Sequence, residues 1–288
     1  MKLAVVQTKP RKGDLAGNLA ALGDVFAQLV AEERPYDLIV LPEAALTGYF
    51  LEGAVHALAR PAAAIASLVA ERWAAAGGGR VDLVLGFYEA DGGSYYNSAA
   101  YLELDGASQR IVHVHRKLFL PTYGVFDEAR FVSRGRRFAT FPTRLGTVAL
   151  LICEDAWHAL MPTLAALRGA RYLIVPSASP GRGFVGGGEL DNVRYWRDVM
   201  RSYAVEHGMF AIYAGLAGFE GGKGMSGSSL AIDPFGRIVG SLPALGAAVL
   251  RAELDDADID LARARLPLLG DLGEVMPDLL RGGEDALL

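Results

Sequence analysis

Short runs of apolar residues recur along the chain and are separated by segments of mixed polarity. Each run is four to eight residues long and rich in β-branched or aromatic side chains, a composition typical of strands that are buried on both faces of a sheet. The runs occupy residues 3–7, 38–41, 81–88, 148–152, 172–175 and 209–213. These six runs predict the buried strands of the protein.

Helical patterns lie between several of these runs. Asp14 can cap a helix whose apolar residues recur about every 3.6 residues and so share one face. Those apolar residues are Leu19, Leu22, Phe26, Leu29 and Val30. Three further helices are expected over residues 62–75, 156–167 and 189–207.

Other segments indicate antiparallel hairpins. Residues 95–104 and 108–115 flank an Asp105-Gly106 turn, a dipeptide favoured in tight hairpins. Residues 228–233 and 237–241 form a second hairpin, and we expect residues 247–253 to add a third strand beside it. Alternating strands and helices mixed with hairpins predict an α/β protein, with one mixed sheet or two packed sheets covered by helices.

Composition narrows the class of protein. The chain has 288 residues, a formal charge of −5 and one cysteine, which excludes an intramolecular disulfide framework and a zinc site of several thiolates. Its mild, dispersed acidity argues against nucleic acid or an anionic membrane surface as a partner. No apolar run approaches the roughly 18 residues needed to span a bilayer. We therefore expect a globular protein of the reducing cytoplasm.

Three reactive side chains share one kind of position. Glu43, Lys117 and Cys153 each follow a predicted strand, and ligands bind beyond the carboxyl ends of strands in α/β sheets. A thiolate can act as the nucleophile, a carboxylate can accept its proton, and an ammonium group can stabilise an oxyanion. Taken singly, each residue type more often has a structural or solvated role. The three together suggest a nucleophilic centre.

Three motifs surround these residues. They are LPEAALTGY at residues 41–49, HRKLFLPTYGVFDEARF at residues 115–131 and LICEDAW at residues 151–157. In order and spacing they resemble the nitrilase, or carbon–nitrogen hydrolase, superfamily. The resemblance extends over residues 1–270, including Gln7 in the first strand and the hairpin at residues 233–236. It leaves residues 271–288 as a C-terminal tail, and the chain from about residue 255 is expected to reach a partner subunit.

The resemblance implies a four-layer α-β-β-α sandwich, with two mixed sheets covered by helices, that commonly forms homodimers or larger homo-oligomers. It implies that Glu43 is the general base, that Lys117 stabilises the intermediate and that Cys153 becomes acylated. Glu128 matches a further family glutamate that positions the lysine, and the backbone N–H of Glu154 is a candidate oxyanion donor. The implied reaction is hydrolysis of a non-peptide C–N bond of a small amide through a thioester. It needs water but no metal or organic cofactor.

The second and third motifs are especially similar to the glutaminase domain of glutamine-dependent NAD synthetase, in which two tyrosines line the glutamine pocket. Tyr49 and Tyr123 match those positions, while Glu154, Ser179 and Arg182 are further candidates for substrate contacts. The chain departs from that family in lacking a pyrophosphate loop of Ser-Gly-Gly-x-Asp-Ser type and in its Gly-rich segment at residues 182–191. We therefore expect a stand-alone amidase-like member.

Other interpretations of the same residues remain open. A Cys–His hydrolase would pair Cys153 with His113, His115 or His158, and a metal site would use these histidines with Asp155.

Two alternatives concern the function rather than the ligands. The chain could be a catalytically silent binding relative, or the glutaminase subunit of an amidotransferase that supplies ammonia to a separate synthetase. Residues 181–186 also match the dinucleotide pattern G-x-G-x-x-G, but the prolines before them favour a flexible loop. The loop at residues 181–188 is a candidate lid.

Overall fold

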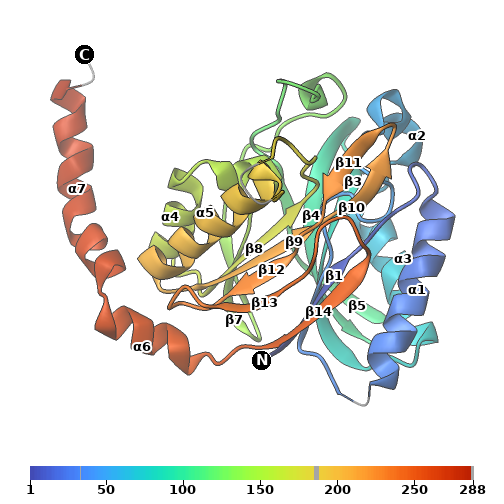
Figure 1. Cartoon of the computed structure of the whole chain (residues 1–288), viewed down its shortest axis with the longest axis horizontal. Helices are drawn as coiled ribbons and strands as arrows, with labels where there is room; N and C mark the ends of the chain where they lie inside the picture. Colours follow the sequence, from blue (N-terminus) through green and yellow to red (C-terminus); the bar gives the residue numbers. More distant parts are fainter. Residues whose placement is uncertain (33, 185–187, 287–288) are drawn as a thin grey trace.

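Two six-stranded sheets packed face to face form the centre of the protein (Figure 1). The computed structural model describes residues 1–32, 34–184 and 188–286. The first sheet has the order β14-β1-β2-β3-β4-β5, and its three central strands β1, β2 and β3 run parallel. Its strands are β1 (Lys2–Gln7), β2 (Leu38–Val40), β3 (Arg80–Asp91), β4 (Ser94–Asp105), β5 (Ser108–Arg116) and β14 (Ala248–Glu253).

The second sheet repeats this plan in the order β13-β12-β9-β8-β7-β6, with β7, β8 and β9 parallel. Its strands are β6 (Thr140–Thr143), β7 (Gly146–Leu150), β8 (Tyr172–Ser177), β9 (Phe210–Gly215), β12 (Leu230–Ile232) and β13 (Ile238–Ser241). A separate two-stranded hairpin consists of β10 (Ala217–Glu220) and β11 (Lys223–Ser226). Both main sheets are mixed, as expected.

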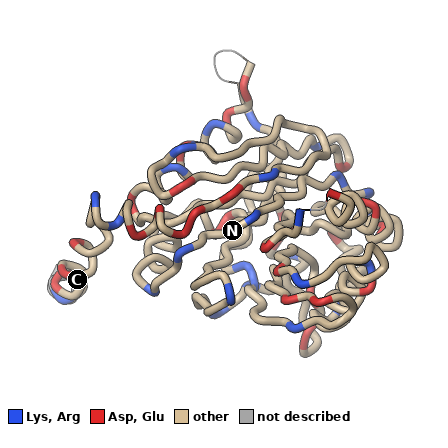
Figure 2. Tube along the Cα trace, turned by 90° about the horizontal axis from the view of Figure 1, so that it is seen from below, with Lys and Arg blue, Asp and Glu red and all other residues tan. Residues whose placement is uncertain are grey.

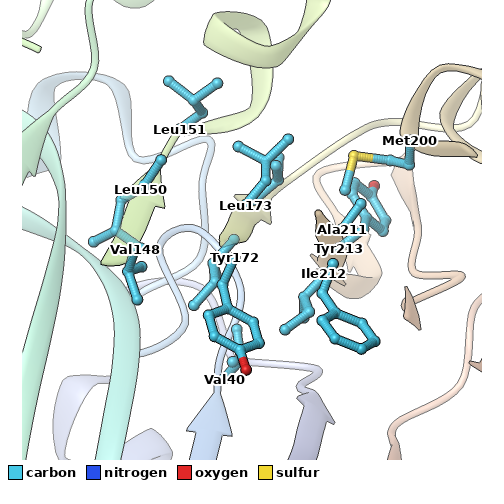
Figure 3. Packing of buried hydrophobic residues seen from close by; sticks show 14 of the residues in the cluster. Val40, Val148, Leu150, Leu151, Tyr172, Leu173, Met200, Ala211, Ile212 and Tyr213 are labelled. Atoms are coloured by element: carbon cyan, nitrogen blue, oxygen red, sulfur yellow. The ribbon is translucent and has the colours of Figure 1, made fainter. Parts of the chain in front are cut away.

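Helices cover the outer faces of both sheets. The first sheet carries α1 (Leu15–Ala31) and α3 (Ala62–Ala75), and the second carries α4 (Leu160–Leu167) and α5 (Asp191–His207). Successive side chains of a central strand point to opposite faces of its sheet, one facing the other sheet and one facing the helices. Val5 packs between the sheets in the same cluster as Tyr172, whereas Val6 belongs to the cluster that includes Phe26 of α1. Figure 3 shows Val40 of the first sheet near Tyr172 of the second. The four-layer α-β-β-α sandwich is therefore confirmed.

Several predicted elements appear where the sequence placed them. Asp14 accepts a hydrogen bond from the Gly17 N–H at 2.9 Å and caps α1, and α3 spans the predicted residues 62–75. Strands β4 and β5 pair through the predicted turn, with Asp105 opposite Ser108. Strands β12 and β13 form the second hairpin.

Two expectations were wrong. Strand β14 pairs antiparallel with β1, so residues 247–253 join the first sheet and not the hairpin of the second. The helix expected over residues 156–167 begins at Leu160, because residues Cys153–Trp157 form the 3₁₀ turn η3. His158, which follows this turn, has an extended backbone with φ −94° and ψ 101°, and this conformation is incompatible with a continuous α-helix before Leu160.

The C-terminal segment is helical. It contains α6 (Ala257–Arg265) and α7 (Leu268–Ala286), and α7 extends away from the sandwich (Figure 1). The boundary proposed at residue 270 falls inside α7. Short helical turns complete the fold at η1 (Glu52–Ala54), α2 (Val55–Leu58) and η2 (Glu128–Arg130).

Basic and acidic residues are interspersed over the chain (Figure 2). Within the three described stretches, no helix has both the length and the apolar character needed to cross a membrane.

Candidate functional site

Glu43 is placed by the turn that follows β2. The Gly86 N–H of β3 donates to the Pro42 carbonyl at 3.0 Å, which fixes this turn against the sheet. A Cβ atom at residue 86 would lie only 2.4 Å from the Cα of Glu43. Glycine is therefore required there, because only its missing side chain allows the two backbones to approach so closely. Glu43 itself is fully buried.

Lys117 follows β5 and points into the same buried region. Its Nζ lies 2.8 Å from Oε1 of Glu43 and 2.7 Å from Oε2 of Glu128. The structure thus brings together three of the four predicted catalytic side chains through direct ion pairs. Asn97 of β4 completes this cluster, because its side-chain amide donates to both carboxylates. Sequence reasoning missed Asn97, because it is one of several polar residues in β4 and no local pattern distinguishes it from the others.

Electrostatics in this cluster favour opposite charge states on neighbouring groups. Burial raises the pKa of Glu43, the charge of Lys117 opposes this shift, and the charge of Glu128 adds to it. Burial alone would lower the pKa of Lys117, but the charges of Glu128 and Glu43 raise it well above its ordinary value. The lysine therefore remains a cation, and the raised pKa of Glu43 suits a group that accepts and returns a proton.

Cys153 follows β7 at the start of η3 and is 8% exposed. Burial and the charge of Glu43 raise the pKa of its thiol, whereas the charge of Lys117 lowers it. Both charged groups therefore act directly on the thiol, and the thiol keeps its proton in the resting state. A base must remove that proton before the sulfur can attack.

Asp155 links the loop of Cys153 to the loop of Lys117. Its Oδ1 accepts from the backbone N–H groups of Leu118 and Phe119, at 2.9 and 3.0 Å. Its Oδ2 accepts from the Ile152 N–H at 3.1 Å and lies 2.8 Å from Nε2 of His115. This buried carboxylate therefore fixes the relative position of two predicted catalytic residues.

The three histidines of the alternative interpretations have other neighbours. His115 bonds to Asp155, His113 stacks on Phe141, and His158 stacks on Phe119. Burial lowers the pKa of His113 to about 4. In the part of the chain that the structure describes, no group of three or more His, Cys, Asp or Glu residues is arranged to hold a metal ion.

Tyr49 contacts the site through Glu128. Its hydroxyl donates to Oε2 of Glu128 at 3.0 Å, and its ring lines a cavity of about 280 Å³ that Glu128 also lines. The buried carboxylate of Glu220, from β10, accepts hydrogen bonds from the backbone N–H groups of Tyr49 and Phe50 at 2.8–3.0 Å. Sequence reasoning missed Glu220, since it lies 171 residues further along the chain.

Tyr123 and Glu154 form a second polar group. The Tyr123 hydroxyl donates to Oε2 of Glu154 at 2.8 Å, and the tyrosine is 45% exposed. Burial and this hydrogen bond raise the pKa of Tyr123 to about 12, while the charges of Arg182 and Cys153 also act on it. The guanidinium group of Arg182 lies 5.1 Å from the ring centre of Trp157. The exposed tyrosine thus contacts an acidic side chain, and the charge of the basic Arg182 also acts on it.

Ser179 is buried, and its hydroxyl accepts a hydrogen bond from the Asn192 side chain at 3.1 Å. Its role in binding substrate remains a prediction. The candidate lid at residues 181–188 includes residues 185–187, which lie outside the described residues. The last two residues of the dinucleotide pattern at 181–186 are among them.

An α-β-β-α sandwich with a buried Glu–Lys pair beside a cysteine is the arrangement that the nitrilase superfamily resemblance implies. The carbon–nitrogen hydrolase family model matches residues 2–264. The chain therefore belongs to this family of hydrolases that act on carbon–nitrogen bonds.

Similar proteins are known in several organisms. The chain is 31% identical over 286 residues to a glutamine-dependent NAD(+) synthetase of Rhodobacter capsulatus, covering 96% of the chain and 48% of the relative. A citrullinase of Francisella tularensis is 26% identical, and the match covers 91% of the chain and 92% of the citrullinase. A solved amidase of the nitrilase superfamily from Nesterenkonia sp. AN1 has a TM-score of 0.73 at 25% identity. The match covers 92% of the chain and 98% of the amidase. The chain spans about half the length of the first of these relatives.

Proposed function

We propose that this chain hydrolyses the carbon–nitrogen bond of a small amide through a thioester on Cys153. The observation that carries the proposal is the buried Lys117, bonded to Glu43 and Glu128 while its charge acts on the Cys153 thiol. Two carboxylates and one ammonium group beside a protonated thiol provide a base, an acid and a cation at one point. Fold alone would not support this activity, because related folds serve many functions.

In the proposed acylation step, Glu43 takes the thiol proton as Sγ bonds to the substrate carbonyl carbon. The oxyanion that forms is stabilised by the Lys117 ammonium group and by the backbone N–H of Glu154. The intermediate then collapses, the C–N bond breaks, and Glu43 returns its proton to the nitrogen. Ammonia leaves, and the acyl group remains on Cys153 as a thioester.

Deacylation uses the same base a second time. Glu43 removes a proton from water as the water oxygen attacks the thioester carbon. The C–S bond then breaks, the carboxylic acid departs, and the proton on Glu43 returns to the thiolate. Glu128 and Asn97 act as positioning residues here, because they bond to Lys117 and Glu43.

The substrate class we favour is an amino acid with a terminal carbamoyl group. Glu154 and Arg182 offer charges complementary to an α-ammonium and an α-carboxylate. Tyr123 bonds to Glu154, and the charge of Arg182 also acts on its hydroxyl. The names of the two relatives point the same way, since glutamine and citrulline are both amino acids that end in such a group. Tyr49 is a further candidate for a substrate contact, because it bonds to Glu128, which in turn bonds to Lys117.

A second candidate is a glutaminase subunit that passes ammonia to a separate synthetase. It is supported by similarity to an NAD synthetase of about twice the length. The two candidates share the thioester chemistry and differ in where the ammonia goes. Ammonia release by the isolated chain supports the first, and release only in the presence of a synthetase supports the second.

The proposal is tested by intact-protein mass spectrometry after rapid acid quenching of reactions with glutamine, citrulline and simple aliphatic amides. We expect a mass increase that equals the acyl half of one substrate and maps to Cys153. Cys153→Ala should fold normally, form no adduct and release no ammonia. Retained turnover in Cys153→Ala would overturn the mechanism.

A further inference from the structure

A basic hollow lies outside the candidate active site, where the chain passes through residues 133–137 after η2. The hollow has a volume of about 310 Å³ and is lined by Tyr96, Arg116, Arg134, Arg136 and Arg137, with Val114 and Gly135. A neighbouring hollow of about 540 Å³ shares Tyr96, Arg134 and Arg136. Among the described residues that line either hollow, none is aspartate or glutamate. Four arginines thus converge on one concave surface.

The backbone that carries these arginines is held firmly in place. The Ser133 N–H donates to the Tyr95 carbonyl and the Gly135 N–H donates to the Lys117 carbonyl, each at 2.7 Å. Residue 135 must be glycine, because a Cβ atom there would lie 2.2 Å from the carbonyl oxygen of Arg116. The side chains of Arg134 and Arg136 therefore start from fixed points on either side of a buried residue. This arrangement reduces the ordering cost of binding a ligand.

The charge in the hollow is largely uncompensated. Arg116 is paired with Glu89 and Asp91. Arg134, Arg136 and Arg137 are exposed. Across the described stretches, none of these three lies within 4.0 Å of a carboxylate. A concentrated positive charge of this kind is unusual in a chain whose formal charge is −5.

We propose that this hollow binds a small molecule that carries a diphosphate or triphosphate group. Guanidinium groups match phosphate oxygens in paired, charge-assisted hydrogen bonds. Three uncompensated arginines suit a ligand with several negative charges better than a single carboxylate. The ligand chemistry is shared by inorganic oligophosphates and nucleotides, and the experiment separates these two sources.

This site is independent of the proposed hydrolysis. None of Glu43, Lys117, Glu128 or Cys153 lines either hollow. Ligand binding should therefore persist in Cys153→Ala, even if the proposed hydrolase chemistry fails. The reverse also holds, since loss of phosphate binding would leave the thioester mechanism untouched.

The test is isothermal titration calorimetry of the full chain with tripolyphosphate, at an ionic strength of about 0.15 M to screen weak surface attraction. We expect one binding site per chain. Arg136→Ala/Arg137→Ala should weaken binding by more than about tenfold, because two charge-assisted contacts are lost. The matched control Arg11→Ala/Arg80→Ala removes two exposed arginines elsewhere and should keep the affinity within about twofold.

Comparison ligands identify the source. Binding of ATP as tight as that of tripolyphosphate supports recognition of the phosphate chain alone, and tighter binding of ATP supports a nucleotide ligand. The proposal is overturned if tripolyphosphate gives no saturable heat, if sulfate binds equally well, or if the control pair weakens binding as much as Arg136→Ala/Arg137→Ala. Circular dichroism of both double variants confirms that they are folded.

Discussion

The side-chain amide of Asn97 donates a hydrogen bond to Oε1 of Glu43 at 2.6 Å in the buried site. The same nitrogen donates to Oε1 of Glu128 at 2.5 Å. One amide therefore holds two carboxylates of like charge while Lys117 bonds to both. Each donated hydrogen bond favours the ionised carboxylate, so Asn97 helps to set the protonation state of the proposed base.

We expect Asn97→Leu to shift the pH dependence of activity. The hydrogen bond from Asn97 lowers the pKa of Glu43 against the larger effect of burial. Its loss raises that pKa further, because a hydrogen bond to the ionised carboxylate no longer opposes the effect of burial. The acidic limb of the kcat/KM profile should therefore move to higher pH. Ser98→Ala is the control, because its hydroxyl bonds to Glu89 outside the site, and an identical shift there would contradict the assignment.

Removal of Lys117 should destabilise the fold as well as abolish turnover. Lys117→Met leaves two buried carboxylates without their cation, and breaking a buried ion pair costs about 3–5 kcal/mol. Lys117→Met/Glu128→Gln removes one of those charges and should recover part of the lost unfolding free energy, measured in urea. Lys12→Met, an exposed lysine, should change stability little. Equal stability of the single and double variants would show that the charges are not coupled.

Local sequence patterns predicted where helices and strands occur better than they predicted which strands pair with each other. Helix α3 has the predicted bounds, since an Ala-rich amphipathic segment specifies its own hydrogen bonds. Strand β14 was predicted as a strand but assigned to the wrong neighbour. Its partner β1 lies at the other end of the chain, and the pattern of a strand does not encode which distant strand it pairs with.

The same limit applies to the site. Glu43, Lys117 and Cys153 were visible because each follows a predicted strand and lies in one of the three motifs, which are local signals. Asn97 and Glu220 acquire their roles only through contacts made across the fold. Helix α7 was missed because its glycines and Pro277 lower the intrinsic preference for helix.

Glu220 lies in the separate two-stranded hairpin, yet we expect it to contribute strongly to the stability of the fold. Its carboxylate accepts from the backbone N–H groups of Tyr49 and Phe50. Glu220→Ala leaves these two donors buried and unpaired, at a cost of about 2–4 kcal/mol in unfolding free energy. Glu220→Gln keeps an acceptor oxygen and should lose less. Glu71→Ala, an exposed glutamate, serves as the control in urea unfolding, and equal losses in all three variants would refute this role.

His113 should make the protein less stable in mild acid. Burial lowers its pKa from 6.5 to about 4 in the folded state, so the unfolded chain binds the additional proton between these values. Stability from this residue is complete above pH 6.5 and declines as the pH falls towards 4. His113→Phe preserves stacking on Phe141 and should reduce the stability difference between about pH 7.5 and pH 5 by about 1–2 kcal/mol, allowing for solvent screening. His56→Phe, an exposed histidine, should retain that difference.

Helix α7 should join two copies of the chain. Leu268, Val275 and Leu279 are 41%, 49% and 60% exposed, and with Leu272 they follow the spacing of a single helix face. A second copy can cover this face with its own α7, as in a symmetric homodimer.

Light scattering coupled to size-exclusion chromatography should therefore give twice the chain mass of 30.6 kDa. Val275→Glu/Leu279→Glu would bury four carboxylates in the symmetric interface, a cost that should shift the chain to the monomer without unfolding it. Glu274→Lys/Arg281→Glu is the matched control, because it exchanges charges on the polar side of α7 and leaves the apolar face intact. A monomeric wild-type chain, or a dimer that survives Val275→Glu/Leu279→Glu, would exclude α7 as the contact.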